Sequence, residues 1–203
     1  MIELKRASPK AIKYACLHFH YARSVPSSQY AYNVYENGEW CGVIIYSTGA
    51  TVNIASPFGL VQGEVLELVR VALNGKQSYT SQCVAASLKK LHADAPQVKM
   101  IVSFADTGQH HLGIIYQATN WLYLGEKDPG HGYTVVRGVK VHPRSLIAKY
   151  GTSSTAWIKE HVDPNAQYIP PFGKHKYIFC FSRKLRREWE KKSLPYPKTD
   201  ADK

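Results

Sequence analysis

The chain has 203 residues, of which 44% are hydrophobic, and its formal net charge is +11. This length supports one domain with a sizeable core. No apolar run reaches the roughly 18–20 residues that span a bilayer, and no apolar signal region follows the first residues, so we expect a soluble, cytoplasmic protein. A positive charge of this size favours a polyanionic partner, nucleic acid before an anionic membrane.

The N-terminal part of the chain is predicted to form one helix and a β-hairpin. Ser8 suits the N-cap of a helix that ends near Phe19, because a proline follows it at the first helical position. Alternating apolar residues predict strands over residues 30–35 and 40–46. The Asn-Gly pair at 37–38 is typical of a tight hairpin turn between them.

The middle of the chain alternates strands with helices. The apolar pattern predicts a strand over residues 64–73, a helix over 81–93 and a strand over 98–104. A short helix over 113–118 then leads to a strand over 121–125. This order predicts an α/β fold with a mixed central β-sheet flanked by helices.

The short helix is expected to turn Ile114, Ile115 and Ala118 towards the core. The elements predicted after it are a strand over 133–141, helices over 144–150 and 156–161, and a strand over 176–181. We expect residues 1–203 to form a single domain, with residues 170–203 as a basic, aromatic C-terminal extension.

That extension concentrates positive charge between aromatic residues. Its cationic residues are Lys174, Lys176, Arg183, Lys184, Arg186, Arg187, Lys191 and Lys192. Its aromatic residues are Tyr177, Phe179, Phe181 and Trp189. Cations hold phosphates and aromatic faces stack on unpaired bases, so the segment is expected to bind nucleic acid; the alternative is a solvated amphipathic helix.

The four cysteines are Cys16, Cys41, Cys83 and Cys180. No pair has the two-residue spacing of a zinc or redox site. We therefore expect reduced, mostly buried thiols that pack as small hydrophobic groups.

Two stretches suggest ligand binding. The loop over 74–80 leads into a helix, whose first N–H groups and positive dipole end suit a pyrophosphate; Ser81 and Gln82 stand there, although Ser81 could be only an N-cap. Asp106, His110 and His111 follow the strand over 98–104. Ligands gather at the carboxyl ends of strands in open α/β sheets, so we expect a functional site there.

Two of these features resemble the GNAT acyltransferase family. In that family a Gln/Arg-x-x-Gly-x-Gly/Ala loop binds the pyrophosphate of acyl-CoA, and Gln82-x-x-Ala85-x-Ser87 keeps the first residue but replaces both glycines. The stretch from Tyr116 to Trp121 looks like the family's Tyr-x-x-x-Gly-Phe step. The resemblance implies that Tyr116 could protonate a leaving thiolate; the alternative is core packing with a satisfied hydroxyl.

Six ordered motifs, spread over nearly the whole chain, are similar to the Mom family of phage DNA-modification proteins. They lie at residues 20–26, 42–46, 68–72, 103–106, 113–121 and 194–198. Mom proteins are GNAT-like and convert adenine in phage DNA to a methylcarbamoyl derivative at its exocyclic amine, which blocks host restriction. The resemblance implies a double-stranded DNA substrate, a small acyl donor, with acetyl-CoA or another acyl-CoA as a possible cofactor, and iron as another. The family's important positions correspond here to His20, Tyr21, Arg70, Ser81, Asp106 and Tyr116.

Chemistry on the adenine amine suggests a role for each residue. A base must accept a proton from the amine, which Asp106 or His20 could do, and Tyr116 could act as the acid. Arg70 could hold an anionic part of the donor or of DNA, or it could simply face solvent or pair with Glu67. An adenine must leave the duplex to react, and His20, Tyr21 or Trp121 could stack on it.

Histidines and a carboxylate also allow a metal hypothesis. Two histidines with one carboxylate suit non-haem iron, and His20 and Asp106 are the candidate ligands. Two other functions remain open: a GNAT-type acetyltransferase acting on a protein or small amine, and a non-catalytic DNA-binding protein. The sequence leaves the oligomeric state open.

Overall fold

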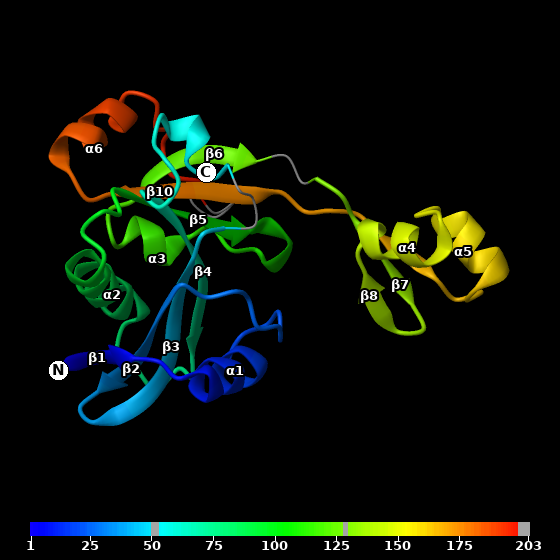
Figure 1. Ribbon diagram of the computed structural model, residues 1–203, viewed down its shortest axis with the longest axis horizontal. Coiled ribbons are helices and arrows are strands. Elements are labelled where there is room, and N and C mark those ends of the chain that lie inside the picture. Colours follow the sequence, from blue (N-terminus) through cyan, green and yellow to red (C-terminus); the bar gives the residue numbers. More distant parts are fainter. Residues whose placement is uncertain (50–52, 128–129, 199–203) are drawn as a thin grey trace. The chain divides into compact units, whose positions relative to one another are not determined.

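The computed structural model describes residues 1–49, 53–127 and 130–198, so residues 199–203 of the expected extension lie outside the described residues. The chain gathers into two compact units, drawn in Figure 1. The first comprises Met1–Ala105, Leu112–Gly125 and His175–Lys203, and the second comprises Asp106–His111 and Glu126–Lys174. Each unit is described by itself below.

A seven-stranded mixed sheet, in the order β1-β2-β3-β4-β5-β10-β6, organises the first unit. Its strands are β1 (Ile2–Arg6), β2 (Tyr30–Glu36), β3 (Glu39–Ser47), β4 (Val65–Leu73), β5 (Met100–Asp106), β6 (Leu122–Lys127) and β10 (Lys174–Cys180). Strands β1 to β4 pair antiparallel, and β4 pairs parallel with β5. The α/β class with a mixed central sheet is confirmed.

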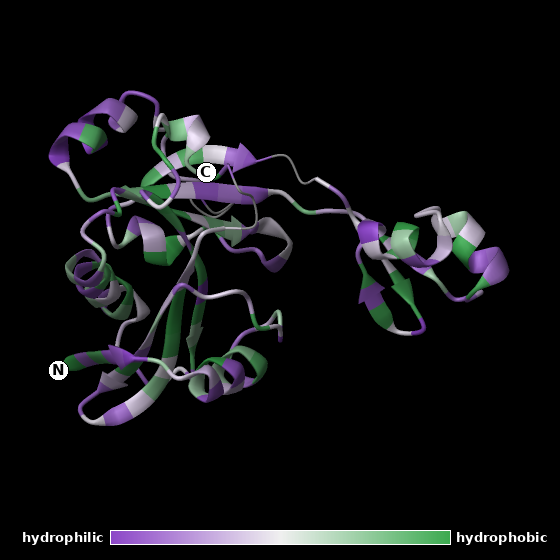
Figure 2. Cartoon of the chain, in the orientation of Figure 1, coloured by the Kyte–Doolittle hydropathy of each residue, from purple (hydrophilic) through white to green (hydrophobic). Residues whose placement is uncertain are grey.

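Helices cover both faces of this sheet, as Figure 1 shows for α1 and α2. The helices of the first unit are α1 (Pro9–His18), α2 (Thr80–Asp94), α3 (Ile114–Gln117) and α6 (Arg183–Glu190), with a 3-10 turn η1 (Ser56–Phe58). Successive residues of a strand point to opposite faces. Val43 and Ile45 of β3 therefore pack in the cluster that contains α1, while Ile44 and Tyr46 pack in the cluster that contains α2. Figure 2 shows the apolar strands enclosed between more polar helix surfaces.

The predicted start of α1 and the predicted hairpin are both confirmed. The Ser8 side chain accepts a hydrogen bond from the N–H of Ala11, and Pro9 is the first helical residue. The β2–β3 turn places Asn37 at φ 52° and Gly38 at φ 84°. Left-handed conformation at both positions is what a two-residue turn of type I′ requires.

The second unit has its own small sheet and core. Strands β7 (Tyr133–Val136), β8 (Val139–Val141) and β9 (Gln167–Ile169) form an antiparallel sheet in the order β8-β7-β9. Helices α4 (Pro143–Tyr150) and α5 (Thr155–His161) contribute Leu146 and Ile158 to a cluster with Val136 and Ala166. The 3-10 turn η2 (Thr107–Gln109) also belongs to this unit.

Two of the predicted elements need correction. The single strand expected over 133–141 is a hairpin, because Arg137 at φ 50° and Gly138 at φ 77° form a second tight turn. Helix α3 is a single turn in which Tyr116 is buried and Ile115 is half-buried against the core, as expected for Ile115, while Ile114 is 62% exposed and Ala118 is exposed. A one-turn helix buries few side chains, and the tyrosine ring removes more apolar area from water than isoleucine does.

The segment expected as an extension supplies an inner strand. β10 lies between β5 and β6, where Tyr177 and Ile178 are fully buried. Trp189 of α6 is also buried. The interleaved aromatic side chains therefore serve the core, and the expectation that they stack on bases is wrong for the buried ones. Strands β1 and β9 had not been expected.

All four cysteines are free and buried, as expected. Burial raises the pKa of the Cys83 thiol and of the Cys180 thiol to about 11, so both stay protonated at neutral pH. Among the described residues, no helix combines the length and the apolar character that crossing a bilayer requires.

Glycine at position 42 is a requirement of the sheet. Gly42 has φ +130°, and an added Cβ would lie 2.1 Å from the carbonyl oxygen of Ala72 on β4. Gly42→Ala should therefore lower the free energy of unfolding by about 3 kcal/mol through strain and overlap. Gly38→Ala is the control, because Gly38 has φ +84° but open space around it; it should cost about 1 kcal/mol. Urea unfolding of both variants measures the difference, and equal losses would contradict the steric argument.

Candidate functional site

Strands β4 and β5 pair only at their beginnings. Val65, Leu66 and Glu67 pair with Met100, Ile101 and Val102. Both strands continue beyond this point, β4 to Leu73 and β5 to Asp106, without further pairs between them in the described chain. The two parallel strands therefore separate at Leu68 and Ser103.

Ser103 connects the two strands where they separate. Its buried Oγ lies 2.8 Å from the carbonyl oxygen of Leu68 on β4 and 2.8 Å from the hydroxyl oxygen of Tyr116 on α3. A serine hydroxyl carries one proton. When Ser103 donates to Leu68, Tyr116 can donate to Ser103; when Ser103 turns, it donates to Tyr116.

The Tyr116 phenol is held in a protonated state. Burial raises its pKa to about 12, and the hydrogen bond from Ser103 acts in the opposite direction. Tyr21 and Glu67 add smaller increases to this pKa. Its ring packs against Trp121 and Tyr177, at centroid distances of 5.0 and 5.2 Å. Tyr116 is therefore a neutral proton donor at physiological pH.

His20 and Tyr21 stand together in the loop after α1. Their rings stack at a centroid distance of 4.4 Å, and Tyr21 is 51% exposed. The N–H of Ala22 donates to His20 Nδ1 at 3.1 Å. In a neutral imidazole this bond places the ring proton on Nε2. His20 is thus arranged to present an N–H, which argues against it as a base in this tautomer.

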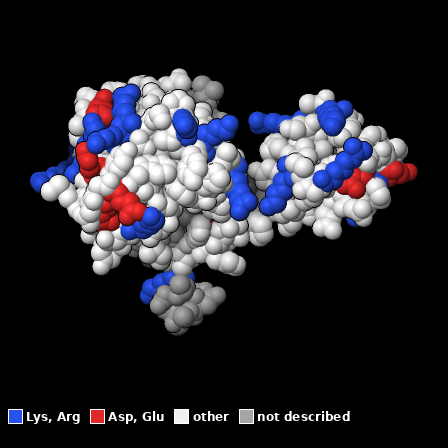
Figure 3. All heavy atoms as spheres, turned by 90° about the horizontal axis from the view of Figure 1, so that it is seen from below, with Lys and Arg blue, Asp and Glu red and all other residues white. Residues whose placement is uncertain are grey.

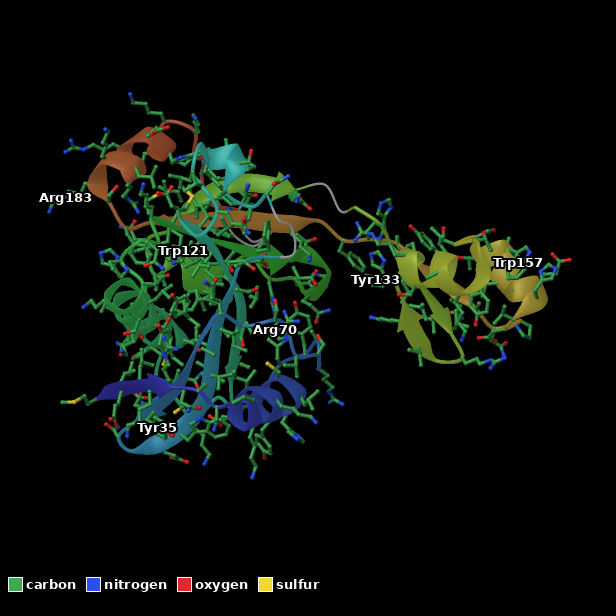
Figure 4. The ribbon with its side chains drawn as sticks, in the orientation of Figure 1. Tyr35, Arg70, Trp121, Tyr133, Trp157 and Arg183 are labelled. Carbon is green, nitrogen blue, oxygen red and sulfur yellow. The ribbon has the colours of Figure 1, made fainter. Side chains whose placement is uncertain are left out.

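Arg70 ties this loop to the sheet. It lies on β4, and its guanidinium donates to Ser24 Oγ at 3.1 Å and to the carbonyl oxygen of Val69 at 2.8 Å. Figure 4 shows Arg70 on the side of the sheet where α1 and the following loop run. Its positive charge also lowers the pKa of Cys16 on α1, against the larger increase from burial. The Nε of Arg70 is buried and has no hydrogen-bond partner among the described residues.

A β-bulge places the Arg70 side chain. Ile45 pairs with Arg70 and Tyr46 pairs with Leu68, so Val69 is an extra residue in β4. Bulges redirect side chains and release backbone groups from a ladder. The bulge at Val69 lies next to Leu68, where β4 and β5 separate.

The expected phosphate cradle is present only in part. No side chain caps the N-terminus of α2, where Tyr79 is the N-cap, so the first N–H groups remain available. Ser81 is half-buried and Gln82 is exposed in this first turn. Ser81 is not the N-cap.

In the loop before α2, one backbone N–H and one lysine side chain already have carboxylate partners within the protein. The N–H of Ser78 donates to a carboxylate oxygen of Glu36 at 2.6 Å, and Lys76 pairs with Glu39. Ser87, which ends the pattern that resembles the GNAT loop, is buried and bonds to the Tyr46 hydroxyl at 2.6 Å. That serine belongs to the core, so the pattern matches at Gln82 alone.

Asp106 lies in the second unit as the last residue of β5. Its carboxylate accepts the N–H of Gly108 at 2.9 Å and caps η2. His110 ends that turn at φ 55°, and the N–H of His111 donates to the Asp106 carbonyl. Its part in the chemistry stays a prediction.

The residues do not support the iron hypothesis. Over the described ranges, no three or more His, Cys, Asp or Glu side chains are grouped to hold a metal ion. His20 Nδ1 is occupied by a backbone N–H, and an Asp106 oxygen by another. We derive no step through a metal.

The first unit therefore brings some predicted residues together. Arg70 donates to Ser24 in the loop that carries His20 and Tyr21. Trp121 is fully buried, which excludes it as a stacking partner for a base. Sequence reasoning gave no role to Ser103, although a serine inside an apolar strand was a signal. It also gave no role to Ser24, for which the sequence offered no comparable signal.

Known proteins resemble this chain in sequence and in fold. The chain is 22% identical over 188 residues to the methylcarbamoylase Mom of Escherichia phage Mu, covering 88% of this chain and 76% of that protein. It matches a Bacillus subtilis acetyltransferase solved in complex with CoA at a TM-score of 0.50 and 12% identity, covering 89% of this chain and 98% of that one. A GNAT-family acetyltransferase from Bacillus cereus matches at a TM-score of 0.46 and 11% identity, covering 90% and 99%.

The Bacillus subtilis match shows that the chain shares the fold of that acetyltransferase, and the Mu methylcarbamoylase is a distant homologue. The model of the Mom protein family matches residues 1–198, almost the full length. The chain belongs to the Mom protein family.

Proposed function

We propose that this protein is a transferase that adds a methylcarbamoyl-type group to the exocyclic amine of adenine in double-stranded phage DNA and so protects it from host restriction. The observation that carries the proposal is the buried, protonated Tyr116 phenol, which is hydrogen-bonded to Ser103 where β4 and β5 separate. Family membership and the methylcarbamoylase relative support the choice of reaction.

The substrate base must leave the duplex before it can react. A base inside the stack is out of reach, and enzymes that modify bases hold the extruded base between flat side chains. The half-exposed ring of Tyr21, backed by His20, suits this contact. The loop is also held in place by Arg70 through Ser24.

The reaction forms a bond between the adenine amine nitrogen and an electrophilic carbon of the donor. The bond between that carbon and the leaving group of the donor, which is the thiolate of an acyl-CoA, breaks as the new bond forms. The nitrogen loses a proton, and the thiolate takes one from Tyr116. Ser103 can then turn its proton from Leu68 towards the phenolate oxygen and stabilise it. The amine proton goes to a general base, and Asp106, which belongs to the second unit, is the residue that the sequence predicts for this role.

An acyl-CoA is the proposed donor, and it would supply the activated carbon. The uncapped first turn of α2, with Ser81 and Gln82, suits its phosphate groups. The buried Nε of Arg70 is a donor that still needs an acceptor. The Glu36 carboxylate already accepts the N–H of Ser78 in the loop before α2. The phosphates would therefore contact the first turn of α2 and not this loop.

Helix α6 is the proposed contact of the first unit with DNA phosphates. Its Arg186 bonds to Glu190 and to the backbone of Asn120, and so fixes the helix. Arg183, Lys184 and Arg187 are exposed, and Figure 4 shows Arg183 projecting from the helix. Cations placed in this way neutralise phosphates without reading the sequence.

The primary test is nucleoside analysis of DNA from cells that express the protein. A modified deoxyadenosine, absent from cells that express Tyr116→Phe, is the expected result. Unmodified DNA together with acetyl-CoA consumption on a protein or small amine would favour an acetyltransferase. Salt-dependent DNA binding with neither reaction would favour a non-catalytic binding protein.

The role of Tyr116 predicts a specific pattern in purified assays. Tyr116→Phe should lower the modification rate about 100-fold or more by removing the acid, while Ser103 keeps its Leu68 acceptor and the fold survives. Because the phenol pKa is about 12, it stays protonated in the ordinary assay range. The rate ratio between the parent and the variant should therefore stay constant from about pH 6 to about pH 9.

Ser103→Ala is the companion variant. It should lower the rate by about three- to tenfold, the effect of one lost hydrogen bond. A Tyr116→Phe variant with full activity would remove the acid role. A rate ratio that falls through that pH range would contradict the raised pKa.

Arg70 has two proposed tasks, which a pair of variants separates. Arg70→Lys should raise the KM for the donor about tenfold or more, since it removes the Nε–H and the guanidinium fork. Ser24→Ala removes only the anchor of the loop, so it should raise the KM for DNA and leave the donor KM unchanged. If Ser24→Ala raises the donor KM as much as Arg70→Lys does, Arg70 acts only as a tether.

A further inference from the structure

The second unit carries a set of cations that the proposed chemistry does not use. Lys140 of β8, Arg144 and Lys149 of α4, and Lys159 of α5 are all exposed. None of the four forms an ion pair with a described carboxylate. Figure 3 shows Lys and Arg side chains at several places on this unit and fewer acidic ones.

Acidic side chains of this unit are largely committed elsewhere. Asp163 is buried, and its oxygens accept the N–H groups of Arg137 at 2.6 Å and Asn165 at 3.0 Å. These bonds lower the pKa of Asp163, so it stays ionised as an internal brace. Glu126 and Glu160 are the exposed acidic residues within the described part of the unit. The surface therefore keeps an excess of positive charge.

The scaffold beneath these cations is already formed. Leu146 of α4 and Ile158 of α5 lie in the unit's core. His142 caps α4 and Ser154 caps α5, each by accepting a backbone N–H. The hydroxyls of Thr134 on β7 and Thr155 on α5 lie 3.0 Å apart. Cations on such a frame lose little backbone entropy when they bind.

Aromatic rings run beside the cations. Trp157, which is labelled at α5 in Figure 4, is 37% exposed and stacks on His161 at a centroid distance of 4.4 Å. Tyr150 follows at 6.3 Å, and the Lys149 ammonium lies 5.1 Å from its centre. Lys149 is thus the one of these four cations with a described contact to an aromatic ring. An anionic membrane is the competing occupant, but the cations are spread over a strand and two short helices rather than along one amphipathic helix.

We infer that these exposed cations of the second unit bind the phosphate backbone of double-stranded DNA. The choice of DNA rests on the proposed function. Each cation that neutralises a phosphate releases a counterion, which makes binding depend on salt with a slope near 0.9 for each contact. Lys140, Arg144, Lys149 and Lys159 supply these contacts, and the unit serves to hold DNA on the protein.

The test measures binding of the full chain to a short DNA duplex, without donor, over a series of salt concentrations. The triple variant Lys140→Gln, Lys149→Gln, Lys159→Gln should reduce the salt slope by about 2 to 3 and weaken binding about tenfold or more near physiological salt. The matched control is Lys10→Gln, Lys13→Gln, Lys89→Gln, three exposed lysines of α1 and α2 in the first unit. The control has the same net charge and should keep the parent slope.

A third variant guards against a folding defect. Lys140→Arg, Lys149→Arg, Lys159→Arg keeps the charges and should keep both slope and affinity. Equal slopes for the two glutamine variants would overturn the inference, as would a parent chain that binds no duplex. Loss of binding to anionic phospholipid vesicles with unchanged DNA binding would assign the surface to a membrane instead.

The outcome is independent of the catalytic proposal. Binding is measured without any reaction, so a chain that binds DNA through these lysines but yields no modified adenine would retain the inference and remove the proposed activity. If adenine is modified but the triple glutamine variant at Lys140, Lys149 and Lys159 keeps the parent salt slope, the inference about these lysines fails and the proposed activity stands.

Discussion

The buried hydroxyl of Ser103 holds the site of the first unit together. It stands where β4 and β5 stop pairing, and it bonds both to the backbone of β4 and to the phenol of Tyr116. A parallel pair that separates inside a core leaves backbone groups that must find other partners. One side chain meets that need at Leu68 and also fixes the atom that would deliver a proton. The same serine hydroxyl thus satisfies the backbone of β4 and positions the proposed acid.

Arg70 couples a second set of residues to the same strand. The bulge at Val69 sets the register of β4, and the guanidinium reaches the loop after α1 through Ser24. The loop then presents Tyr21 with His20 behind it. A sheet irregularity therefore determines where an exposed aromatic ring stands. This arrangement is more rigid than a loop held only by its own backbone, which suits the proposed stacking of Tyr21 on a base.

Much of the fold could be predicted from local patterns. Ser8 and Pro9 marked a helix start, and the Asn-Gly pair marked a hairpin, because the physics of both features lies within a few residues. The hairpin at Arg137-Gly138 was missed, since an arginine in left-handed conformation has no strong sequence signal. Burial in α3 was also misjudged, because a one-turn helix has no periodicity to read. Of the site, Tyr21 and Tyr116 came from family motifs, whereas Ser103 became evident only when β4 and α3 were seen around it.

The position of β10 has a consequence for how the chain is made. This strand lies between β5 and β6, yet residues 174–180 follow both of them and the whole second unit in the sequence. During synthesis, the edges of β5 and β6 stay open until almost nine-tenths of the chain has left the ribosome. The second unit can fold in that interval around its own core. Closure of the large sheet is then a late, non-local event, of the kind that slows folding and leaves strand edges open to aggregation. In a nascent chain halted before β10, strand β5, which carries Ser103, would lack its pairing partner on one edge. Premature termination should therefore yield insoluble fragments rather than a partially active enzyme.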